Sequence, residues 1–325
     1  MLNPKMKRKE CYLAGILAAA AAISLLSGCG GGTPSLEEAL KKTASYEQTS
    51  IPSPASDSLG GEWTVIALAR SGEEAIDGYY EKYRANLEKR VKEQEGVLSE
   101  NRYTEYARAV LACKAIGIDP SDIGGYDLGK PLDDFEAVTA QGLNGAVYAL
   151  LALNADRSDI DGELEQKYLT YIVQQEKPSG GFSLDDSSDT ADVDLTAMTL
   201  QCLEPYATEE EISAIIDRGV EFLADAQAED GGYEAYGDKS SESVSQVILA
   251  LSTYGIDCNK DARFQKKEKG LYDNLMEYYK KDGSFSHILD GDSDPMATDQ
   301  AFCAMAAYSR FLNGKTSFYD MSDTN

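Results

Sequence analysis

The sequence predicts an all-α fold built from repeated helix pairs, and three observations lead to this prediction. Strand-like alternation of apolar and polar residues is almost absent. Alanine-rich apolar segments recur at spacings of 40 to 54 residues, with centres near Ala67, Ala112, Ala152, Cys202, Ala250 and Ala304. Each of them follows a glycine-rich turn and precedes a more charged segment. Such a unit cannot bury its apolar face alone, so we expect stacked copies to share one core.

The first 28 residues are typical of a targeting segment. Basic residues at 5–9 precede an apolar run at 13–26, which is too short to span a bilayer. The run ends in LSGC at 26–29, which resembles the lipobox of bacterial lipoprotein signal peptides. The resemblance implies that residues 1–28 are cleaved and that Cys29 carries a lipid. An ordinary secretory signal followed by a chance cysteine is the alternative.

The charge balance is strongly acidic, with 56 Asp and Glu against 30 Lys and Arg and a formal net charge of -26. Such a surface repels phosphate backbones, so we expect no nucleic-acid partner. It also repels anionic lipid headgroups, so membrane contact should come from the lipid on Cys29 and the tether at 29–34. We therefore expect an exported protein, anchored on the outer face of the cytoplasmic membrane.

The helices are predicted in order from residue 35. A capping box, SLEE at 35–38, opens the first helix, and Pro52 and Pro54 follow its end. Six inner helices, apolar on nearly every side, are expected at 62–71, 103–117, 139–153, 192–206, 242–256 and 297–312. One-sided outer helices alternate with them, as at 78–94, 209–227 and 266–280. The result is a single domain over 35–321 with a tail at 322–325, and the repeat fits a ring or a linear solenoid.

The turns carry a resemblance to a known family. The segment 218–233 resembles the QW repeat of squalene-hopene and oxidosqualene cyclases through Arg218, Gly219, Phe222, Leu223, Gln227, Gly231 and Tyr233. Degenerate copies lie at 168–182 and 271–285, about 51 residues apart. Glycine permits the tight turn, the aromatic residue packs between helix pairs, and glutamine can bond freed backbone groups.

The chain as a whole resembles the α/α toroids of the terpene cyclase/prenyltransferase superfamily, and more narrowly their extracellular, prenyltransferase-like members in Gram-positive bacteria. The marks of this resemblance are GGEW at 60–63, QGLNG at 141–145, DVDLTAM at 192–198, ESVSQ at 242–246 and MATDQ at 296–300. It implies an (α/α)6 toroid with six inner and about six outer helices. The same barrel serves the cobalamin-carrying domain of intrinsic factor and transcobalamin, so the fold alone does not fix the function.

One segment matches the catalytic motif of class II terpene cyclases in part. The sequence DVDLTA at 192–197 resembles their DxDD-Thr-Ala motif, which implies Asp194 as the acid that protonates an alkene, with Asp192 in the first position. The chain departs from the motif at Leu195, where that family has its third aspartate. The alternative is structural, with Asp192 as a helix N-cap and Asp194 in the first helical turn.

Metal and thioester chemistry find little support in the sequence. The only histidine is His287, and no Asp-x-Cys motif accompanies it, which argues against the zinc site of protein prenyltransferases. No cysteine lies in a complement-type thioester motif. The acidic loops at 185–189 and 290–294 are expected to be solvated rather than to bind calcium. Four cysteines of the mature chain permit one disulfide without naming the pair: Cys113, Cys202, Cys258 and Cys303.

A ligand pocket is expected where the inner helices begin. Its candidate lining residues are Glu62, Trp63, Tyr103, Gln141, Asn144, Tyr148, Glu242, Gln246, Asp299 and Gln300. The leading interpretation is a binding or scaffolding module for a small hydrophobic or corrinoid ligand, or for a surface protein. No cofactor is required, although a cobalamin-like ligand fits the resemblance. The alternative is a cyclase-like lyase or isomerase with Asp194 as its general acid.

Overall fold

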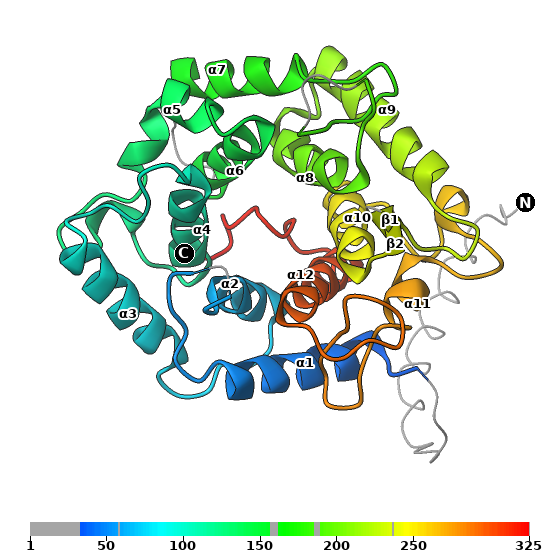
Figure 1. Cartoon of the computed structure of the whole chain (residues 1–325), viewed down its shortest axis with the longest axis horizontal. Coiled ribbons are helices and arrows are strands. Elements are labelled where there is room, and N and C mark those ends of the chain that lie inside the picture. The colour runs from blue at the N-terminus through cyan, green and yellow to red at the C-terminus, as the bar shows by residue number, and fades with distance from the viewer. Residues whose placement is uncertain (1–32, 58, 157–161, 185–188, 236, 325) are drawn as a thin grey trace, which may run out of the picture. The chain divides into compact units, whose positions relative to one another are not determined.

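The computed structural model describes residues 33–57, 59–156, 162–184, 189–235 and 237–324. Figure 1 looks along the axis of the ring of helices formed by the unit that begins at Pro34. The predictions made for residues 1–32, including the lipid on Cys29, lie outside the described residues, as do Asp185 and Asp186.

Six of the described helices form the inner wall of the ring. They are α2 (Glu62–Ser71), α4 (Tyr103–Ala115), α6 (Leu143–Asn154), α8 (Val193–Leu203), α10 (Ser241–Thr253) and α12 (Pro295–Leu312). Each packs on the next, and α12 packs on α2, which closes the ring (Figure 1). Alanine keeps this wall thin enough to pack on all sides, as at Ala301, Ala304 and Ala306 of α12, which are fully buried. The predicted all-α toroid is confirmed, and a linear solenoid is excluded.

The outer helices bury one face each. They are α1 (Leu36–Ser50), α3 (Tyr79–Glu93), α5 (Phe135–Thr139), α7 (Gly162–Val173), α9 (Glu210–Ala226) and α11 (Leu271–Leu275). In α9, Ile212, Ile216, Val220 and Leu223 face inward at helical spacing, while charged residues face outward. Short 3-10 helices supplement them: η1 (Pro120–Asp122), η2 (Lys130–Asp133), η3 (Glu204–Tyr206) and η4 (Ala262–Phe264).

The outer helix expected over 266–280 is much shorter than predicted. Only Leu271–Leu275 is α-helical, because the chain then turns so that Tyr279 pairs with Phe285 as an isolated bridge. The two rings contact each other at 5.2 Å between centroids. A two-residue hairpin, β1 (Glu234–Ala235) with β2 (Asp238–Lys239), adds the paired strands that precede α10.

The glycine-rich turns hold neighbouring units together. Gln227 donates from Nε2 to the carbonyl oxygens of Gly231, at 2.9 Å, and of Phe264, at 3.0 Å. Tyr233 is fully buried and donates its hydroxyl to the carbonyl of Leu223 at 2.9 Å. At Gly283 the backbone has a φ of +100°, and a Cβ would lie 2.6 Å from the carbonyl oxygen of Lys42, so no other residue fits there.

The chain end crosses one end of the barrel. Arg70 donates to the carbonyls of Phe318, Ser317 and Asp320, and its guanidinium pairs with Asp323 at 2.6 Å. Arg310 pairs with the same carboxylate. The residues expected to form a tail at 322–325 therefore include Asp323, which two largely buried arginines hold in place.

The four cysteines Cys113, Cys202, Cys258 and Cys303 are free and buried in this structure. Burial raises the pKa of each thiol, so each behaves as a small apolar side chain. Among the described helices, none combines the length and the apolar character needed to cross a bilayer.

Candidate functional site

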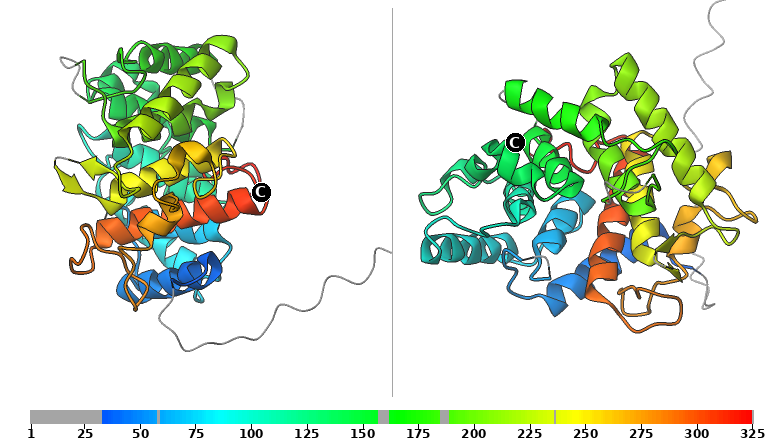
Figure 2. Two further views of the ribbon diagram at one scale, coloured as in Figure 1. Left: turned by 90° about the vertical axis from the view of Figure 1, so that its right-hand side faces the viewer. Right: turned by 45° about the horizontal axis from the view of Figure 1, so that its top comes forward.

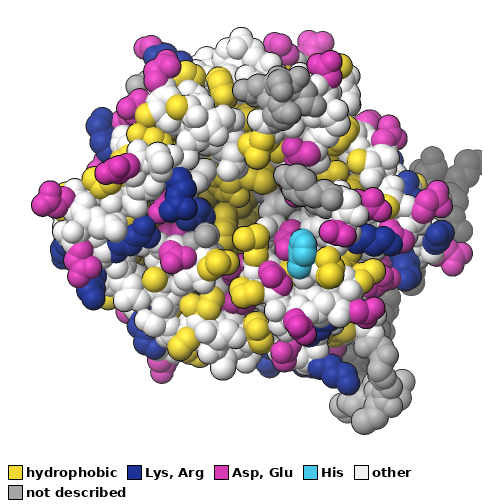
Figure 3. All heavy atoms as spheres, viewed as in Figure 1, with side chains coloured by type: hydrophobic (Ala, Val, Ile, Leu, Met, Phe, Trp, Pro, Cys, Tyr) yellow, Lys and Arg dark blue, Asp and Glu magenta, His cyan; other side chains and the backbone are white. Residues whose placement is uncertain are grey.

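The inner helices all begin at one end of the barrel, which we call the mouth. Their opposite ends meet the C-terminal segment, residues 313–324, through the side chains of Arg70 and Arg310 and the backbone of Lys114 and Ala155. The left view of Figure 2 places this segment and the β1–β2 hairpin at opposite ends of the barrel. Figure 3 looks onto the mouth and shows a central hollow with hydrophobic side chains on its walls.

Trp63 and Tyr148 meet inside the barrel. Their ring centroids lie 5.9 Å apart with an interplanar angle of 55°. Trp63 belongs to α2 and Tyr148 to α6, and α4 stands between these helices in the ring (Figure 1), so the contact crosses the lumen. Burial raises the pKa of Tyr148 to about 12, and the charge of Arg108 on α4 opposes this rise.

A chain of amide side chains links three inner helices. Gln201 of α8 donates to Oε1 of Gln246 on α10, and Gln246 donates to Oε1 of Gln300 on α12, each at 3.1 Å. Gln246 and Gln300 are half-buried. Two of the predicted pocket residues thus form one polar strip, and the sequence did not predict the third member, Gln201.

Asp192 and Thr196 have a role in the fold. Asp192 is the N-cap of α8 and accepts from the backbone N–H of Leu195 at 2.7 Å. Thr196 accepts from the backbone N–H of Phe182 at 2.8 Å and donates to the carbonyl of Asp192. The same bonds recur at α12, where Asp294 caps the helix and Thr298 accepts from Phe285. The aspartate and threonine of the cyclase-like motif therefore belong to the repeat.

Asp194 has no such counterpart in α12, where the equivalent position is Met296. It lies half-buried in the first turn of α8, and its Oδ1 is buried without a hydrogen-bond partner among the described residues. Burial raises the pKa of Asp194, Ser243 lowers it, and the charges of Asp192 and Glu242 raise it further. The carboxyl is thus biased toward its protonated form.

Glu242 occupies the position in α10 that Asp194 occupies in α8. Both of its carboxylate oxygens lie 2.8 Å from Nδ1 of His287, and Oε2 accepts from the hydroxyls of Ser240 and Ser241. The hydrogen bond to Glu242 raises the pKa of His287, whose side chain is 52% exposed. A hydrogen-bonded pair of a carboxylate and an imidazole therefore lies on the rim of the mouth, and the charge of its Glu242 acts on Asp194.

Three predicted pocket residues lie at the starts of α4 and α6. Gln141 accepts from the backbone N–H of Tyr103 at 2.6 Å and so bonds the first turn of α4. The ring of Tyr103 packs against the ring of Tyr106, with their centroids 6.0 Å apart. Asn144 is half-buried in the first turn of α6, and its Oδ1 has no hydrogen-bond partner within the described part of the chain.

Glu62 and Asp299 lie between helix layers and not with the other candidates. Glu62 accepts from the hydroxyl of Tyr83 on α3 and from Nε of Arg108, and burial raises its pKa to about 7. Asp299 accepts from the hydroxyl of Thr64, which also lies within hydrogen-bonding distance of Glu47 on α1. Burial raises the pKa of Asp299 to about 7 and that of Glu47 to about 8, the latter helped by repulsion from Asp299.

The sequence did not predict a polar cavity of about 510 Å3 beside the mouth, between α3, α4 and the loop before α2. We call it the basic pocket, and its lining residues are Ala55, Ser56, Asp57, Asn86, Arg90, Arg102, Thr104, Glu105 and Arg108. The one feature of the sequence that could have indicated this pocket is the spacing of Arg102, Glu105 and Arg108. It places two arginines on one face of a helix in an otherwise acidic chain.

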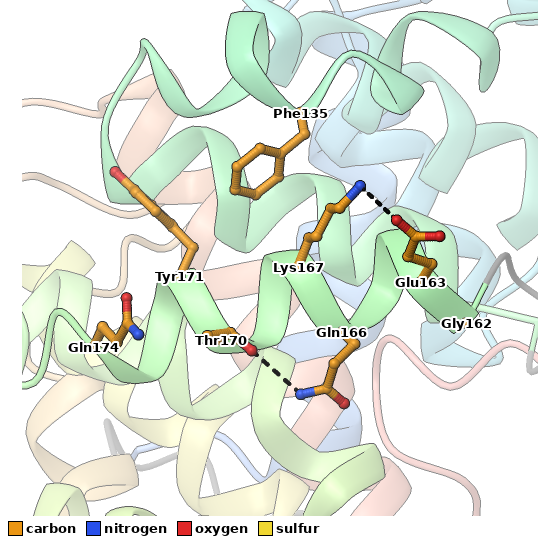
Figure 4. A pocket seen from close by; sticks show the side chains of 8 residues that line it. All are labelled: Phe135, Gly162, Glu163, Gln166, Lys167, Thr170, Tyr171 and Gln174. Atoms are coloured by element: carbon orange, nitrogen blue, oxygen red, sulfur yellow. Dashed lines mark hydrogen bonds and ion pairs between the residues drawn. The ribbon is translucent and has the colours of Figure 1, made fainter.

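A cavity of about 730 Å3 lies on the outside of the ring, between α5 and α7 (Figure 4). We call it the outer groove. Phe135 and Tyr171 supply its aromatic side, and Lys167 pairs with Glu163 at 2.9 Å on the other. Within the described residues, no group of three or more His, Cys, Asp and Glu side chains could hold a metal ion.

Comparison with solved structures finds the same fold in proteins of different activity. An unsaturated glucuronyl hydrolase from Bacillus sp. GL1 superposes with a TM-score of 0.58 at 13% identity, over 87% of this chain and 97% of the other. The type II terpene cyclase MstE from Scytonema, in complex with geranylgeranyl dihydroxybenzoate, gives 0.56 at 12% identity, over 85% and 98%. A polysaccharide lyase gives 0.54 at 12% identity, over 86% and 97%. At these identities the likeness shows the fold alone.

No curated protein matches the sequence. The model of one family, the prenyltransferase alpha-alpha toroid domain, matches residues 128–324, which is more than half of the chain. These residues include α6, α8, α10 and α12 and the three glycine-rich turns. The chain belongs to the prenyltransferase alpha-alpha toroid family.

Proposed function

We propose that this chain is an exported, lipid-anchored binding module that takes a small ligand with an apolar body into the mouth of its barrel. The observation that carries the proposal is the contact of Trp63 with Tyr148 across the lumen. Two half-buried aromatic rings, supplied by the two inner helices on either side of α4, are a suitable surface for an apolar molecule. The amide strip of Gln246 and Gln300 supplies hydrogen bonds that would orient it.

The far end of the barrel supports a single route of entry. The C-terminal segment crosses that end, and burial raises the pKa of the Tyr319 hydroxyl within it. Arg70 and Arg310 hold the segment. A ligand would therefore enter and leave through the mouth.

Exposed apolar side chains on the segments that lead into inner helices extend this surface. Leu59 precedes α2, Leu184 precedes α8, and Ile288 and Met296 lie before and at the start of α12, each between 44% and 56% exposed. Such side chains suit a ligand delivered from a membrane or a surface protein. A small hydrophobic molecule, a corrinoid or a protein partner remain the candidate ligand classes.

The single tryptophan of the chain makes the proposal testable. Titration with a polyprenol or with cobinamide should change the emission of Trp63, because a ligand in the mouth would displace or cover its contact with Tyr148. Tyr148→Ala should weaken binding, whereas Tyr171→Ala in the outer groove should not. Native mass spectrometry of protein purified from its host would identify a co-purifying ligand. No emission change with any ligand and no co-purifying molecule would reject a small-ligand role.

The anchor is part of the proposal and has its own test. With residues 30–34 as the tether, Cys29 would hold the start of α1 within roughly 20 Å of the bilayer at full extension. Cys29→Ser should release the protein into the medium. Retention of this variant on the membrane, or an N-terminal peptide without lipid in the mature protein, would show that Cys29 does not carry the anchor.

Catalysis by Asp194 is the second candidate, and the unpartnered, buried Oδ1 of this residue favours it. A carboxyl biased toward protonation at the rim of an apolar hollow could donate a proton to an alkene. Incubation with a linear polyprenyl substrate should then give a cyclised product of unchanged mass, and Asp194→Asn should abolish it. The absence of product from the unmodified chain would exclude this activity for that substrate class.

A further inference from the structure

The loop that precedes α12 lies at the rim of the mouth, and we call residues 286–294 the rim loop. Ser286 and Ser293 pair as an isolated antiparallel bridge, which closes its base. At its tip Asp290 has a φ of +59°, a left-handed conformation that few residues other than glycine adopt. The nearby Ile288 is exposed. The base of the rim loop is therefore fixed by backbone pairing, whereas its tip depends on further contacts.

Three contacts join the rim loop to the first turn of α10. The backbone N–H of Ser241 donates to the carbonyl of His287 at 3.1 Å, and the Ser241 hydroxyl donates to the carbonyl of Ser286 at 2.8 Å. The third contact joins two side chains, since Nδ1 of His287 lies 2.8 Å from both carboxylate oxygens of Glu242. Of the three, this contact alone contains an imidazole, the group that titrates near neutral pH.

The carboxylate of Glu242 is held in place by groups other than the imidazole. Its side chain is 12% exposed, and Oε2 accepts from the hydroxyls of Ser240 and Ser241 at 3.0 and 3.2 Å. The side chain of His287 is exposed, so solvent can deliver protons to its ring. It is the one histidine of the chain, cyan in Figure 3, and it lies beside the central hollow. A positioned carboxylate thus contacts an exchangeable proton at the entrance to the barrel.

The groups that raise the pKa of His287 come from three elements. The hydrogen bond to Glu242 of α10 contributes most, partial burial opposes it, and the charge of Glu242 adds to the rise. Asp294, the N-cap of α12, and Asp238 of β2 raise the pKa further. Two more carboxylates lie on the rim loop itself: Asp290 and Asp292. The ring therefore keeps its proton at a pH above 6.5, where a solvated histidine is mostly neutral.

We propose that the contact between His287 and Glu242 is a pH-sensitive latch, which holds the rim loop against α10 and slows the entry of a ligand into the mouth. The latch adds regulation to the proposed binding site, and its effect on a ligand rests on that proposed function. Below pH 6.5 the imidazolium and the carboxylate form a charge-assisted hydrogen bond, so the latch is at full strength. As the pH rises through the higher pKa of the latched ring, the bond loses its positive partner and weakens.

The size of the change follows from the two kinds of hydrogen bond. A charge-assisted bond is about twice as strong as a neutral one, so the open form of the rim loop should become about fivefold more populated at alkaline pH. The other two contacts to α10 contain only hydroxyl and backbone groups, and they do not titrate in this range. The rim loop therefore opens more often without leaving its base.

The latch can be measured on the mature chain without a ligand. The NMR signals of the single imidazole should titrate above pH 6.5, and in Glu242→Gln they should titrate closer to that value. Amide hydrogen exchange at residues 286–294, corrected for the intrinsic effect of pH, should become about fivefold faster between pH 6 and pH 8.5. Residues 227–233 form a glycine turn without histidine, and their corrected exchange should show no such step.

Variants assign the step to the latch. His287→Gln can still donate a neutral hydrogen bond to Glu242 but cannot gain a proton, so exchange in the rim loop should be fast at both pH values. Asp292→Asn is the matched control, because it removes a charge from the rim loop and leaves His287 and Glu242 in place. This control should keep the step. A step that persists in His287→Gln would overturn the proposal.

Ligand entry separates the latch from the proposed binding function. Stopped-flow mixing with a polyprenol, followed by Trp63 emission, should give an association rate about fivefold higher at pH 8.5 than at pH 6, and equal rates in His287→Gln. An imidazole that titrates at pH 6.5, or exchange without a step, would overturn the latch whether or not a ligand binds. A step in exchange with an unchanged association rate would overturn its control of entry. A step in exchange with no emission change for any ligand would support the latch and reject the binding function.

Discussion

Glu47→Gln should make the chain more stable at alkaline pH while leaving its stability near pH 5 almost unchanged. Glu47 of α1 and Asp299 of α12 are both 2% exposed, and both lie within hydrogen-bonding distance of the hydroxyl of Thr64, at 3.2 and 2.9 Å. One hydroxyl has one proton to donate, so the second carboxylate would be buried without a donor if both were ionised. Folding therefore favours the protonated form of the pair.

The size of the effect follows from the pKa of Glu47, which burial and the neighbouring Asp299 raise from 4.5 to about 8. A carboxyl whose pKa is raised by folding contributes its full stability below the unfolded pKa and loses it as the pH rises toward the folded pKa. At ~1.4 kcal/mol per pKa unit, the loss between pH 4.5 and pH 8 is on the order of 5 kcal/mol. Glutamine has no proton to lose, so the variant avoids this part of the loss, although Asp299 still titrates.

Urea unfolding at several pH values between 5 and 9, followed by Trp63 emission, measures this difference. The free energy of unfolding of the unmodified chain should fall more steeply with pH than that of Glu47→Gln. The matched control is Glu37→Gln, an exposed position on the same helix, which should leave the slope unchanged. Parallel curves for Glu47→Gln and the unmodified chain, or a variant that is less stable at pH 8.5, would show that folding does not raise the pKa of Glu47.

Three further predictions concern stability and are measured by urea unfolding. Asp192→Ala should lower the free energy of unfolding by about 1 kcal/mol, because α8 loses its N-cap. An unchanged free energy of unfolding would mean that the residue does not act as a cap. Arg70→Ala should lower the free energy of unfolding by about 3 kcal/mol and accelerate amide hydrogen exchange at residues 316–324. Exchange as slow as in the unmodified chain would show that other contacts hold the segment. Gly283→Ala should lower the free energy of unfolding by about 3 kcal/mol or more, because its φ is positive and a Cβ would clash with the carbonyl of Lys42. Gly314→Ala also has a positive φ but nothing within 4 Å of the added Cβ, so it should lower the free energy of unfolding by only about 1 kcal/mol. Equal losses for the two variants would mean that the carbonyl of Lys42 does not restrict position 283.

The inner helices could be predicted well because their signal is local. A segment that is apolar on all sides and rich in alanine has few alternatives, and the helix predicted at 62–71 has the same bounds in the structure. Lys266–Lys280 shows the limit of this approach, since its pattern resembles an outer helix. There the contact of Tyr279 with Phe285, fixed by the glycine turn between them, competes with helix formation.

The site was predictable only in part, because the direction of a side chain on an inner helix depends on both neighbours. Trp63 and Glu62 are adjacent in sequence, yet Trp63 contacts Tyr148 inside the barrel while Glu62 lies against Tyr83 of an outer helix. The basic pocket draws residues from three elements between Ala55 and Arg108, and no motif links them. The cyclase-like motif, by contrast, was visible, and the structure adds that its Asp192 recurs as Asp294 in the repeat.

Photo-crosslinking of an apolar ligand shows directly whether the mouth of the barrel is the ligand site. A farnesoic acid analogue with a benzophenone at its apolar end would be irradiated with the mature chain, and the adducts mapped by peptide mass spectrometry. If the ligand binds in the mouth, we expect adducts on α2 and α6 around Trp63 and Tyr148, and farnesoic acid should compete them away. Adducts confined to the outer groove around Phe135 and Tyr171 would contradict it.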